Sequence, residues 1–300
     1  MKILITGANG LLGQHLVNHL LLTNHQIIAT GKGPTRLPFT ESDLYSYLTL
    51  DISNKASIEK TMQQIGDIDV VVHAAASTQV DDCENNKEAA YTNNVIGTSN
   101  LLEATKGKIK QFVYISTDFV FDGVNGFYKE DDVLNPVNWY GQTKKTAEEK
   151  VRETNLPWTI IRTCLVYGNT LSGTRANIIT WVKDNLENKR PIKVVSDQVR
   201  TPTYVEDLAN GIILAIQKNA KGIYHISGNE TLTPYDMAMK TVSFFNLDAT
   251  LITKVDASTF SQPGKRPQKT GFSIEKAQRD LGYQPISFEE GIKKMFAKVQ

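Results

Sequence analysis

Cysteine is scarce in this chain of 300 residues, and it has neither a long apolar run nor an excess of one charge. The two cysteines, Cys83 and Cys164, stand in unrelated contexts, which argues against a disulfide framework or a metal site and favours a reducing compartment. No run reaches the ~18 apolar residues that a membrane span needs. The net charge of +1 gives no reason to expect a nucleic acid or membrane partner. Met1 leads straight into a core strand, so we expect no signal peptide and a soluble, cytoplasmic protein.

The first residues have the pattern of a dinucleotide site. An apolar segment with strand character, Lys2–Thr6, leads into a glycine turn and then an apolar helix ending near Leu22. Gly7 permits the tight turn, Gly10 lets the backbone approach a pyrophosphate, and Gly13 lets the helix pack on the strand. The anion would rest on the free amides of the helix N-terminus. The spacing is G-x-x-G-x-x-G, and the alternative is a structural glycine turn in another kind of α/β protein.

Strand-like and helix-like segments alternate along the chain, which predicts an α/β fold with a doubly wound parallel sheet of Rossmann type. The seven strands are expected at residues 2–6, 26–30, 47–50, 69–73, 111–115, 157–162 and 222–226. Further helices are expected at residues 88–105, 171–188, 203–217 and 288–299. We assign residues 1–165 and 204–228 to the NAD(P)-binding sheet domain. A smaller C-terminal substrate-binding lobe is assigned to residues 166–203 and 229–300.

Tyr140 and Lys144 are the candidate catalytic pair. They lie in a predicted helix, residues 139–152, that follows Pro136. Residues four apart lie on one helix face, and an ammonium beside a phenol favours the phenolate, so the Tyr140 pKa is expected to fall towards neutrality. A general acid that works near pH 7 needs such a pKa. The alternative is a pair on a solvated helix face.

Lys32 bears on the choice of cofactor. The second strand of a dinucleotide fold is usually followed by an acidic residue that binds the ribose 2′-hydroxyl of NAD. Here Gly31, Lys32 and Gly33 follow that strand, with Arg36 soon after and no carboxylate before Glu41. A basic residue there favours the 2′-phosphate, so we expect NADP(H) to be preferred, with NAD(H) left open. Lys32 in a merely solvated position is the alternative.

Together these motifs resemble the extended short-chain dehydrogenase/reductases, and within them most closely the dTDP-4-dehydrorhamnose reductases. The likeness covers the whole chain, and its most family-specific part is the string Ser-Thr-Asp-x-Val-Phe-x-Gly. Its motifs are Gly7–Gly13, Ser116–Gly123, Pro136–Tyr140 with Lys144, Ile161–Gly168, Asp197–Gln198 with Pro202–Thr203, and Arg266–Pro267.

The resemblance implies NADP-dependent reduction of a keto group on a nucleotide-linked deoxysugar, at C4 in the family. Tyr140 would give the proton, and Thr117 would donate a hydrogen bond to the same oxygen. Lys144 would lower the phenol pKa and hold the nicotinamide ribose. Asn94 matches the residue that holds a water next to that lysine, and its neighbour Asn93 is the alternative.

The resemblance also implies two sets of binding residues. Asp51 would accept from the adenine amino group, and the small side chains after His73 would let the cofactor lie against backbone, with His73 itself only packed. Arg200 and Arg266 lie in the lobe that would cover a diphosphate, with an ordinary surface salt bridge as the alternative for Arg200. Independently of the resemblance, the polar, glycine-containing loop 122–132 is expected to form a flap over the site. The cofactor set is Gly7, Asn9, Gly10, Leu11, Leu12, Gly13, Lys32, Asp51, Ile52, Ala74, Ala75, Ala76, Tyr140 and Lys144. The substrate set is Thr78, Val80, Thr117, Asp118, Phe119, Leu165, Arg200 and Arg266.

The chain departs from the reductase pattern at its sugar pocket. Phe119 stands where the reductases usually have Tyr, and Leu165 stands where they typically have Trp. A bulkier segment, residues 199–201, replaces a glycine. The sugar, the nucleoside and the oligomeric state stay open, a homodimer included. Two alternatives remain: a nucleotide-sugar epimerase or dehydratase, and a non-catalytic NADP-binding regulatory subunit like the β subunit of methionine adenosyltransferase.

Overall fold

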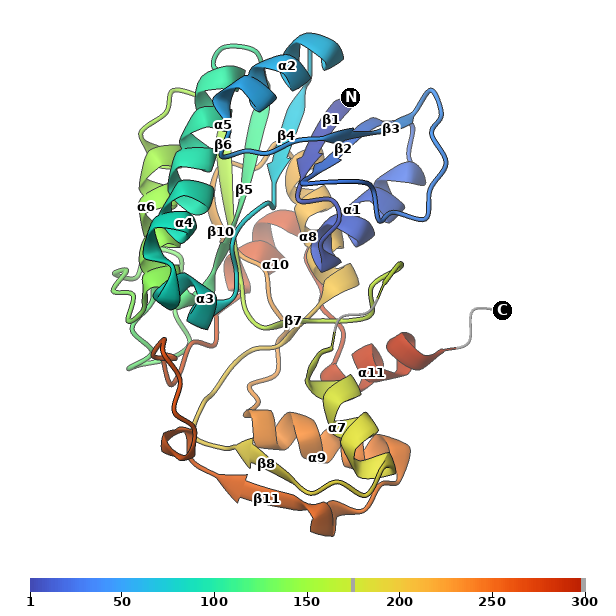
Figure 1. The fold of residues 1–300 in the computed structure, drawn as a ribbon, viewed down its shortest axis with the longest axis vertical. Coiled ribbons are helices and arrows are strands. Elements are labelled where there is room, and N and C mark those ends of the chain that lie inside the picture. Colours follow the sequence, from blue (N-terminus) through green and yellow to red (C-terminus); the bar gives the residue numbers. More distant parts are fainter. Residues whose placement is uncertain (174–175, 298–300) are drawn as a thin grey trace.

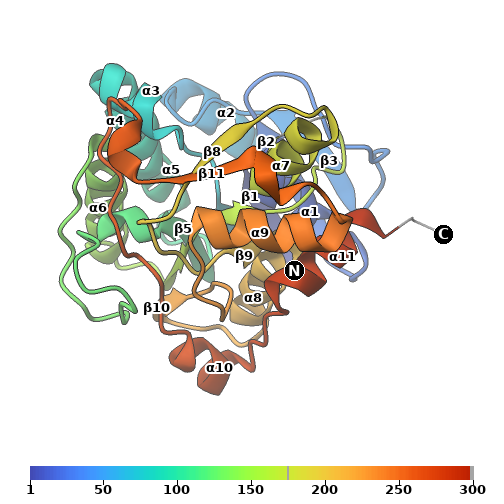
Figure 2. The same ribbon diagram turned by 90° about the horizontal axis from the view of Figure 1, so that it is seen from below.

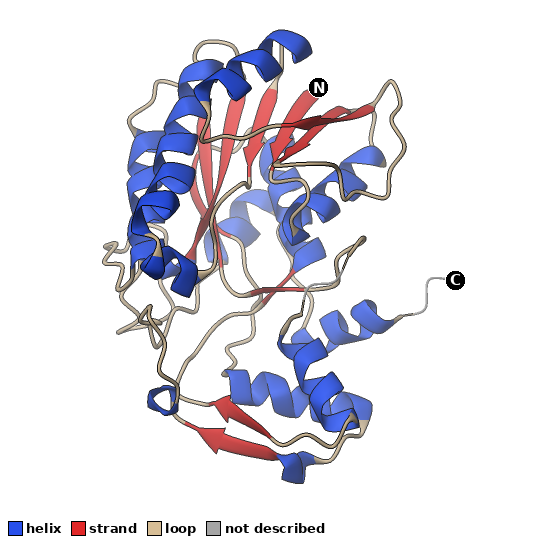
Figure 3. Ribbon diagram, in the orientation of Figure 1, coloured by secondary structure: helices blue, strands red, loops and turns tan. Residues whose placement is uncertain are grey.

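The computed structural model describes residues 1–173 and 176–297. Seven strands form one sheet in which all neighbours are parallel, in the order β10-β6-β5-β4-β1-β2-β3 (Figures 1 and 3). The strands are β1 (Lys2–Thr6), β2 (Gln26–Gly31), β3 (Tyr45–Thr49), β4 (Val70–His73), β5 (Gln111–Thr117), β6 (Trp158–Thr163) and β10 (Gly222–His225). The predicted fold class, a doubly wound parallel sheet of seven strands, is confirmed.

The central strands are buried on both faces, as parallel strands covered by helices must be. All four residues of β4 are buried, and so are four of the five residues of β1. Ile3 of β1 pairs with Ile27 of β2 on one side and with Val70 of β4 on the other. The strand order therefore reverses beside β1. Ligands of open α/β sheets bind at such a switch point, outside the carboxyl ends of the strands.

Helices cover both faces of the sheet (Figure 1). Two separate apolar cores lie under them, one on each face. One face carries α1 (Leu11–Leu21), α8 (Val205–Gln217) and α10 (Glu275–Leu281), and the other carries α2 (Lys55–Ile65), α5 (Gly97–Thr105) and α6 (Trp139–Arg152). Among the described residues, no helix is both long enough and apolar enough to cross a membrane.

The helix predicted at residues 88–105 has a more complex form. It follows a short helix, α3 (Val80–Asn85), and consists of α4 (Lys87–Tyr91), a π-helical turn (Thr92–Ile96) and α5. The side chain of Asn86 starts α4 by accepting a hydrogen bond from the Ala89 amide at 3.1 Å. A π-helical turn is wider than an α-helical one, and such turns are frequent at functional sites.

The second lobe lies below the sheet in Figure 1, and Figure 2 looks onto it. It contains a pair of parallel strands, and two of its helices share an apolar core with that pair. Another parallel pair of strands, β7 with β9, lies between the two lobes. The elements are β7 (Val166–Tyr167), α7 (Ile178–Glu187), β8 (Ile192–Val195), β9 (Thr203–Tyr204), α9 (Pro234–Phe245), β11 (Ile252–Val255) and α11 (Phe288–Phe296).

Two predicted helices have different ends in the structure. The helix expected from residue 171 begins at Ile178, because the side chain of Asn177 accepts hydrogen bonds from the amides of Ile179 and Thr180 and fixes the start. Position 174 of its predicted first turn lies outside the described residues. The closing helix ends at Phe296, and positions 298–299 of the predicted span also lie outside the described residues.

One C-terminal segment packs on the sheet rather than in the lobe to which the sequence assigned it. Phe272, Ile274, Leu281 and Tyr283 belong to the apolar core beneath α1 and α8. These residues therefore pack with the sheet domain, although the sequence analysis assigned residues 229–300 to the substrate-binding lobe. Apolar residues alone do not reveal which of two neighbouring cores will bury them.

Candidate active site

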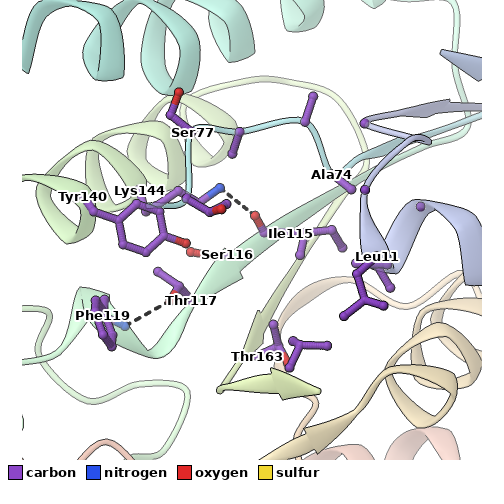
Figure 4. A pocket seen from close by; sticks show the side chains of 18 of the residues that line it. Leu11, Ala74, Ser77, Ile115, Ser116, Thr117, Phe119, Tyr140, Lys144 and Thr163 are labelled. Carbon is purple, nitrogen blue, oxygen red and sulfur yellow. Dashed lines mark hydrogen bonds between the residues drawn. The ribbon is translucent and has the colours of Figure 1, made fainter. Parts of the chain in front are cut away.

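A cavity of about 820 Å³ opens at the carboxyl ends of β1, β4 and β5 (Figure 4). The sheet lobe forms most of its wall, and Gln198, Pro234 and Arg266 from beyond the sheet complete it. The predicted site residues that line it are Gly7, Gly10, Leu11, Leu12, Gly13, Lys32, Asp51, Ile52, Ala74, Ala75, Ala76, Thr78, Val80, Thr117, Asp118, Phe119, Tyr140, Lys144, Leu165, Arg200 and Arg266. Asn9 and Asn94 are not part of the wall.

The glycine turn lies against the backbone that follows β4. Gly7 has a φ of 73°, which favours glycine, and a Cβ there would lie 2.7 Å from the Ala75 amide nitrogen. A Cβ on Gly13 would lie 2.4 Å from the carbonyl oxygen of Gly7. The first turn of α1 therefore lies close to β1, with its free amides at the cavity. This cradle suits a pyrophosphate.

Asn9 supports the cradle without lining it. Its Nδ2 donates to the Pro34 carbonyl at 3.0 Å and to the Tyr47 hydroxyl at 2.9 Å, and its Oδ1 accepts from the Arg36 amide at 2.8 Å. The sequence placed Asn9 in the cofactor set. Its side chain instead ties the glycine turn to the loop after β2.

Lys32 and Asp51 meet at one end of the cavity. The Lys32 ammonium lies 2.9 Å from the Asp51 carboxylate, and 73% of the Lys32 side chain is exposed. Asp51 also accepts a hydrogen bond from the Ser53 hydroxyl at 2.6 Å. This bond and the contact with Lys32 lower the pKa of Asp51. Lys32 is thus an ion-paired cation in the cavity wall, with its head open to solvent.

α6 carries the candidate catalytic pair on its buried face. The side chain of Asn138 starts the helix by accepting from the Gly141 amide at 2.8 Å, and its Nδ2 donates to the Lys265 carbonyl at 2.7 Å. Tyr140 and Lys144 are 9% and 3% exposed. The alternative of a solvated helix face is therefore wrong.

Gly141 sets how closely α6 approaches the end of β5. A Cβ on Gly141 would lie 2.1 Å from the Phe119 carbonyl oxygen, so only glycine permits this contact. The Tyr140 ring packs edge-on to that of Phe119, with centroids 5.9 Å apart. Figure 4 shows the Tyr140 hydroxyl directed towards Ser116 and Thr117. A glycine directly after Tyr140 thus indicates close packing of this helix, a signal that the sequence analysis did not use.

Thr117 is the last residue of β5. Its hydroxyl donates to the Asp118 carboxylate at 3.1 Å and accepts from the Phe119 amide at 3.2 Å, which starts the 3₁₀ turn Asp118–Val120. Its position at the carboxyl end of a central strand places this hydroxyl at the cavity.

Burial decides the charges of the candidate pair. It lowers the pKa of Lys144 to about 7, which the charge on Glu148 partly opposes. Burial raises the pKa of Tyr140, which a hydrogen-bond contact with the Thr117 side chain partly opposes. The expectation of a lowered phenol pKa is therefore wrong for the protein by itself. Desolvation of both groups outweighs the helical spacing on which that expectation rested.

Asn94 lies behind the cavity wall. Its Oδ1 accepts from the Ser77 amide at 2.7 Å, and its Nδ2 donates to the Ser77 carbonyl at 3.0 Å and to the Thr143 hydroxyl at 2.9 Å. Its neighbour Asn93 lines the cavity and donates to the Ser77 hydroxyl at 3.0 Å. Both belong to the π-helical turn, whose wider geometry the sequence did not reveal.

His73 is a packed strand-end residue, as expected. Its Nδ1 lies 2.7 Å from the Thr6 hydroxyl and its Nε2 lies 3.0 Å from the Thr98 hydroxyl. Burial lowers its pKa to about 3, which keeps the ring neutral. The ring therefore joins β4 to β1 and α5.

Arg200 is part of the protein interior. It is 4% exposed, and its guanidinium donates to the carbonyls of Pro267, at 2.7 Å, and Gln268, at 2.9 Å. Its Nε lies 3.7 Å from the carboxylate of Asp118. The guanidinium is committed to these partners, so the diphosphate contact expected of Arg200 does not fit its surroundings.

Arg266 has a different partner. Its guanidinium forms a two-pronged contact with the Asp81 carboxylate, with Nη2 to Oδ2 at 2.7 Å, and the Gly264 amide donates to the same carboxylate at 3.1 Å. Arg266 lowers the pKa of Asp81. The contact joins the segment around Gly264 to α3, beside the cavity that Arg266 lines.

Phe119 and Leu165, two departures from the reductase pattern, lie in the cavity wall, and so does Arg200 of the bulkier segment 199–201. Phe119 lines the cavity beside Tyr140, and its ring lies 5.7 Å from the Arg200 guanidinium. Leu165 is 42% exposed and has a φ of 39°. The loop 122–132 is not part of the wall. It is fixed to the segment 269–273 by backbone hydrogen bonds, including the Lys269 amide to the Gly123 carbonyl at 3.0 Å, so the expected flap is wrong.

Several cavity residues were not in the predicted sets. Those at strand ends follow the rule that ligands meet the carboxyl ends of a parallel sheet, and that rule could have identified them. Those from connecting segments carry no comparable signal. The residues are Thr6, Gly31, Leu50, Ser77, Asn93, Ile115, Ser116, Thr163, Val166, Gln198, Leu208 and Pro234.

A group of potential metal ligands lies outside the cavity, although the sequence suggested no metal site. His15 and His19 of α1 and Glu206 of α8 bring donor atoms within 4.8 Å of one another. His15 Nε2 donates to the Asn169 carbonyl at 2.8 Å, which leaves Nδ1 directed towards Glu206 at 3.9 Å. The spacing of four residues places both histidines on one face of α1, and the packing of α1 on α8 brings Glu206 to them.

Comparison with known proteins finds similarity over the whole chain. A family model described as "RmlD substrate binding domain" matches residues 1–300. The spore coat polysaccharide biosynthesis protein SpsK of Bacillus subtilis (strain 168) is 33% identical over 296 residues, which cover 97% of this chain and 95% of that protein. Methionine adenosyltransferase 2 subunit beta of Pongo abelii is 31% identical over 299 residues, 97% of this chain and 86% of that protein.

Two solved structures are similar in fold and sequence. A dTDP-4-dehydrorhamnose reductase from Clostridium acetobutylicum ATCC 824 has a TM-score of 0.85 and 30% identity, with 98% of each chain covered. A dTDP-4-dehydrorhamnose reductase from Bacillus anthracis str. Ames, solved in complex with NADP, has a TM-score of 0.83 and 29% identity, with 99% of each chain covered.

Proposed function

The chain belongs to the family of the RmlD substrate binding domain, and from this membership we propose that it uses NADPH to reduce a keto group on a nucleotide-linked deoxysugar. The observation that carries the proposal is one continuous cavity. At one end lie the glycine turn and Lys32, and at the other lie Thr117, Tyr140 and Lys144. A cofactor cradle and a proton donor therefore face the same space.

The cavity residues fit NADPH. The tight packing of Gly7 and Gly13 leaves the first amides of α1 free for a pyrophosphate. Lys32 places a largely exposed ammonium at the end of the cavity where the adenosine 2′-phosphate would lie, with Asp51 beside it. The similar reductase that was solved with NADP agrees with this choice.

Three side chains perform the chemistry at the substrate. NADPH, when bound, supplies the hydride that the keto carbon receives. Tyr140, which burial keeps protonated, gives its phenol proton to the oxygen as that oxygen becomes an alkoxide. Thr117 turns its hydroxyl from Asp118 and donates to the same oxygen, an interaction strongest in the transition state. The Lys144 ammonium lowers the pKa of the phenol when it is charged.

Arg266 is the candidate ligand for the substrate diphosphate. Its planar fork suits phosphate oxygens as well as a carboxylate. In the structure Asp81 occupies that fork, so a diphosphate has to compete with Asp81 for it. The buried Arg200 instead holds Asp118 and the segment 267–268 in place.

The sugar pocket differs from that of a typical rhamnose-pathway reductase. Phe119 and Leu165 occupy wall positions where Tyr and Trp are usual, so a hydroxyl and a flat aromatic wall are missing. We therefore expect the best substrate to be a keto-deoxysugar other than dTDP-4-dehydrorhamnose.

Substrate-dependent oxidation of NADPH tests the proposal. The protein is mixed with NADPH and a panel of dTDP- and GDP-linked 4-keto-6-deoxysugars, and the loss of reduced cofactor is followed together with the sugar product. Lys55→Ala, a change on exposed α2 outside the cavity, serves as the folded control. Lack of turnover with every member of the panel, while NADPH still binds, counts against a reductase.

A regulatory role is the second candidate, because methionine adenosyltransferase 2 subunit beta is among the similar proteins. A regulatory subunit would bind NADPH in the same cradle and need no turnover. In that case Tyr140→Phe would leave every measurable activity unchanged. An epimerase or dehydratase, in contrast, would convert its sugar without net consumption of NADPH.

A further inference from the structure

The ring of Tyr114 lies beneath the side chain of Lys144. Tyr114 belongs to β5 and is 1% exposed, and the Lys144 ammonium nitrogen lies 4.1 Å from the centroid of its ring. A cation over the face of an aromatic ring is attracted by the negative face of the π system, most strongly where water is excluded. Here both groups are almost fully buried.

The other partners of the ammonium are few. Among the described residues, the structure gives it one hydrogen-bond acceptor, the Ile115 carbonyl at 2.7 Å, which Figure 4 shows. An ammonium has three donors, and burying it without compensation is costly. The face of the Tyr114 ring therefore stabilises the buried Lys144 ammonium where hydrogen-bond acceptors are missing.

The titratable and charged groups around Lys144 come from four elements. Tyr140 and Glu148 lie on α6 with it, and His73 of β4 is kept neutral by burial. Arg162 of β6 binds Glu148, with Nη2 to Oε2 at 2.7 Å, and Ser116 of β5 donates to the same carboxylate at 2.5 Å. Glu148 is thus already ion-paired with Arg162. The Tyr114 ring therefore remains as a close group that stabilises the positive charge of Lys144.

We propose that Tyr114 is a positioning residue for Lys144: the face of its ring holds the ammonium in its charged form at the end of β5, beside the proton donor Tyr140. Lys144 is near its titration midpoint at neutral pH, so a modest attraction decides how much of it is charged. The ring acts through Lys144 and does not touch the substrate. Only the catalytic consequence of this placement rests on the proposed function.

Titration of Lys144 by NMR tests the placement without turnover. Lysine labelled with ¹³C at Cε is incorporated, the Lys144 signal is assigned by its loss in Lys144→Met, and its shift is followed against pH in the cofactor-free protein. Tyr114→Leu should lower the Lys144 pKa by about one unit, the size expected of a buried cation–π contact. Tyr114→Phe keeps the ring face and should titrate like the unmodified protein.

Phe112→Leu is the matched control. Phe112 is buried, two residues earlier on the same face of β5, and belongs to the same apolar core as Tyr114. It should lower stability as Tyr114→Leu does and leave the Lys144 titration unchanged. Should Tyr114→Leu not fold, Tyr114→Met, which fills more of the same volume without a π face, takes its place.

The catalytic consequence is read from the pH profile of kcat. Charged Lys144 is the useful form, so activity is lost as pH rises through its pKa, and Tyr114→Leu should move that loss about one unit towards acid. Equal Lys144 titrations in Tyr114→Leu, Tyr114→Phe and the unmodified protein would overturn the inference, whatever the turnover. A shifted NMR titration in a protein that turns over no sugar would support the inference and count against the proposed function.

Discussion

At the scale of single residues, burial acts on the two members of the candidate pair in opposite directions. It keeps the proton on the phenol of Tyr140 and favours the loss of a proton from the ammonium of Lys144. Both effects disfavour the charged form, because little water reaches either group. Folding therefore favours the neutral form of each group, and only for Lys144 does this oppose the form that is usual at neutral pH.

Tyr140→Phe tests the proton donor. The change removes one oxygen and leaves the ring packed on Phe119. We expect kcat to fall by about 10²–10⁴-fold, the usual contribution of a positioned general acid, while NADPH affinity changes little. Steady-state kinetics and a fluorescence titration of NADPH measure the two quantities. Tyr91→Phe, at the exposed end of α4, is the control, and near-full activity of Tyr140→Phe would assign the proton to another group.

Lys144→Met should make the protein more stable, and more so at low pH. The folded pKa of about 7 lies below the unfolded value of 10.5, so the folded state disfavours the charged form. The free-energy cost of burying the Lys144 ammonium is fully present below the folded pKa and fades as pH rises towards the unfolded pKa. At about 1.4 kcal/mol per pKa unit, the gain in unfolding free energy is several kcal/mol near pH 6 and less than half of that near pH 9.

Urea denaturation at the two pH values measures this gain. Lys145→Met is the control, because Lys145 is the next residue of α6 and its side chain is 30% exposed. A Lys144→Met gain that does not depend on pH would mean that Lys144 keeps an ordinary pKa in the folded protein.

Lys32→Asp tests the choice of cofactor. The ammonium stands where an acid would bind the ribose of NAD, and Asp51 lies 2.9 Å away. The reversed charge repels a 2′-phosphate, so we expect the KM for NADPH to rise at least tenfold and the KM for NADH to fall. Lys60→Asp on α2 is the control for the change in charge. Equal KM values for the two cofactors in the unmodified protein would contradict the assignment.

At the scale of elements, the start of α6 is fixed at three points. Asn138 caps it, Gly141 touches the turn after β5, and Lys144 reaches the Ile115 carbonyl. The helix therefore approaches β5 more closely than side chains normally allow. This approach brings Tyr140, the candidate proton donor on the helix, to the Thr117 hydroxyl at the end of β5.

Gly141→Ala should move Tyr140 of α6 away from Thr117 at the end of β5. The new Cβ would lie 2.1 Å from the Phe119 carbonyl oxygen, so the first turn of α6 has to move away. A displacement of ~1 Å at a reacting group can cost about 10²-fold in rate, so we expect kcat to fall by that order with NADPH binding kept. Kinetics and circular dichroism check the result. Gln142→Ala, the adjacent change in α6, should be nearly neutral, and wild-type kcat in Gly141→Ala would disprove the positional argument.

At the scale of the whole molecule, two lobes close on one cavity. The sheet lobe supplies the glycine turn and the candidate proton donor, and segments beyond the sheet supply Arg266 and part of the opposite wall. The contact between Arg266, which lines the cavity, and Asp81 joins the segment around Gly264 to α3. If Arg266 binds the substrate as proposed, a diphosphate has to exchange this contact for its own.

Asp81→Asn should therefore strengthen the binding of dTDP. The change removes the carboxylate that competes for Arg266, and a partly exposed ion pair corresponds to an effect of about two- to fivefold in Kd. Isothermal titration calorimetry measures the Kd. Asp82→Asn, the next residue of α3, is more exposed and should have no effect. Weaker binding by Asp81→Asn would show that the pair positions Arg266 rather than competing for it.

The sequence by itself determined the fold class and most of the cavity wall. Apolar segments such as residues 69–73 specify a strand buried on both faces. The glycines at positions 7 and 13 specify a turn in which backbones approach too closely to leave room for a side chain. These features are local, so their physical reason can be read from neighbouring residues. Tyr140 and Lys144 were found in the same way, by their helix spacing, whereas Thr117 was implied by the family resemblance.

The tertiary structure decided the charges, the partners and the exact contacts of these residues. Burial reversed the expected pKa shift of Tyr140, because desolvation depends on the whole surrounding fold rather than on the residue one turn away. Arg200 is buried in the interior, and Asn93 rather than Asn94 lines the cavity. Such outcomes depend on which distant segments meet, and the local pattern of a chain does not contain that information.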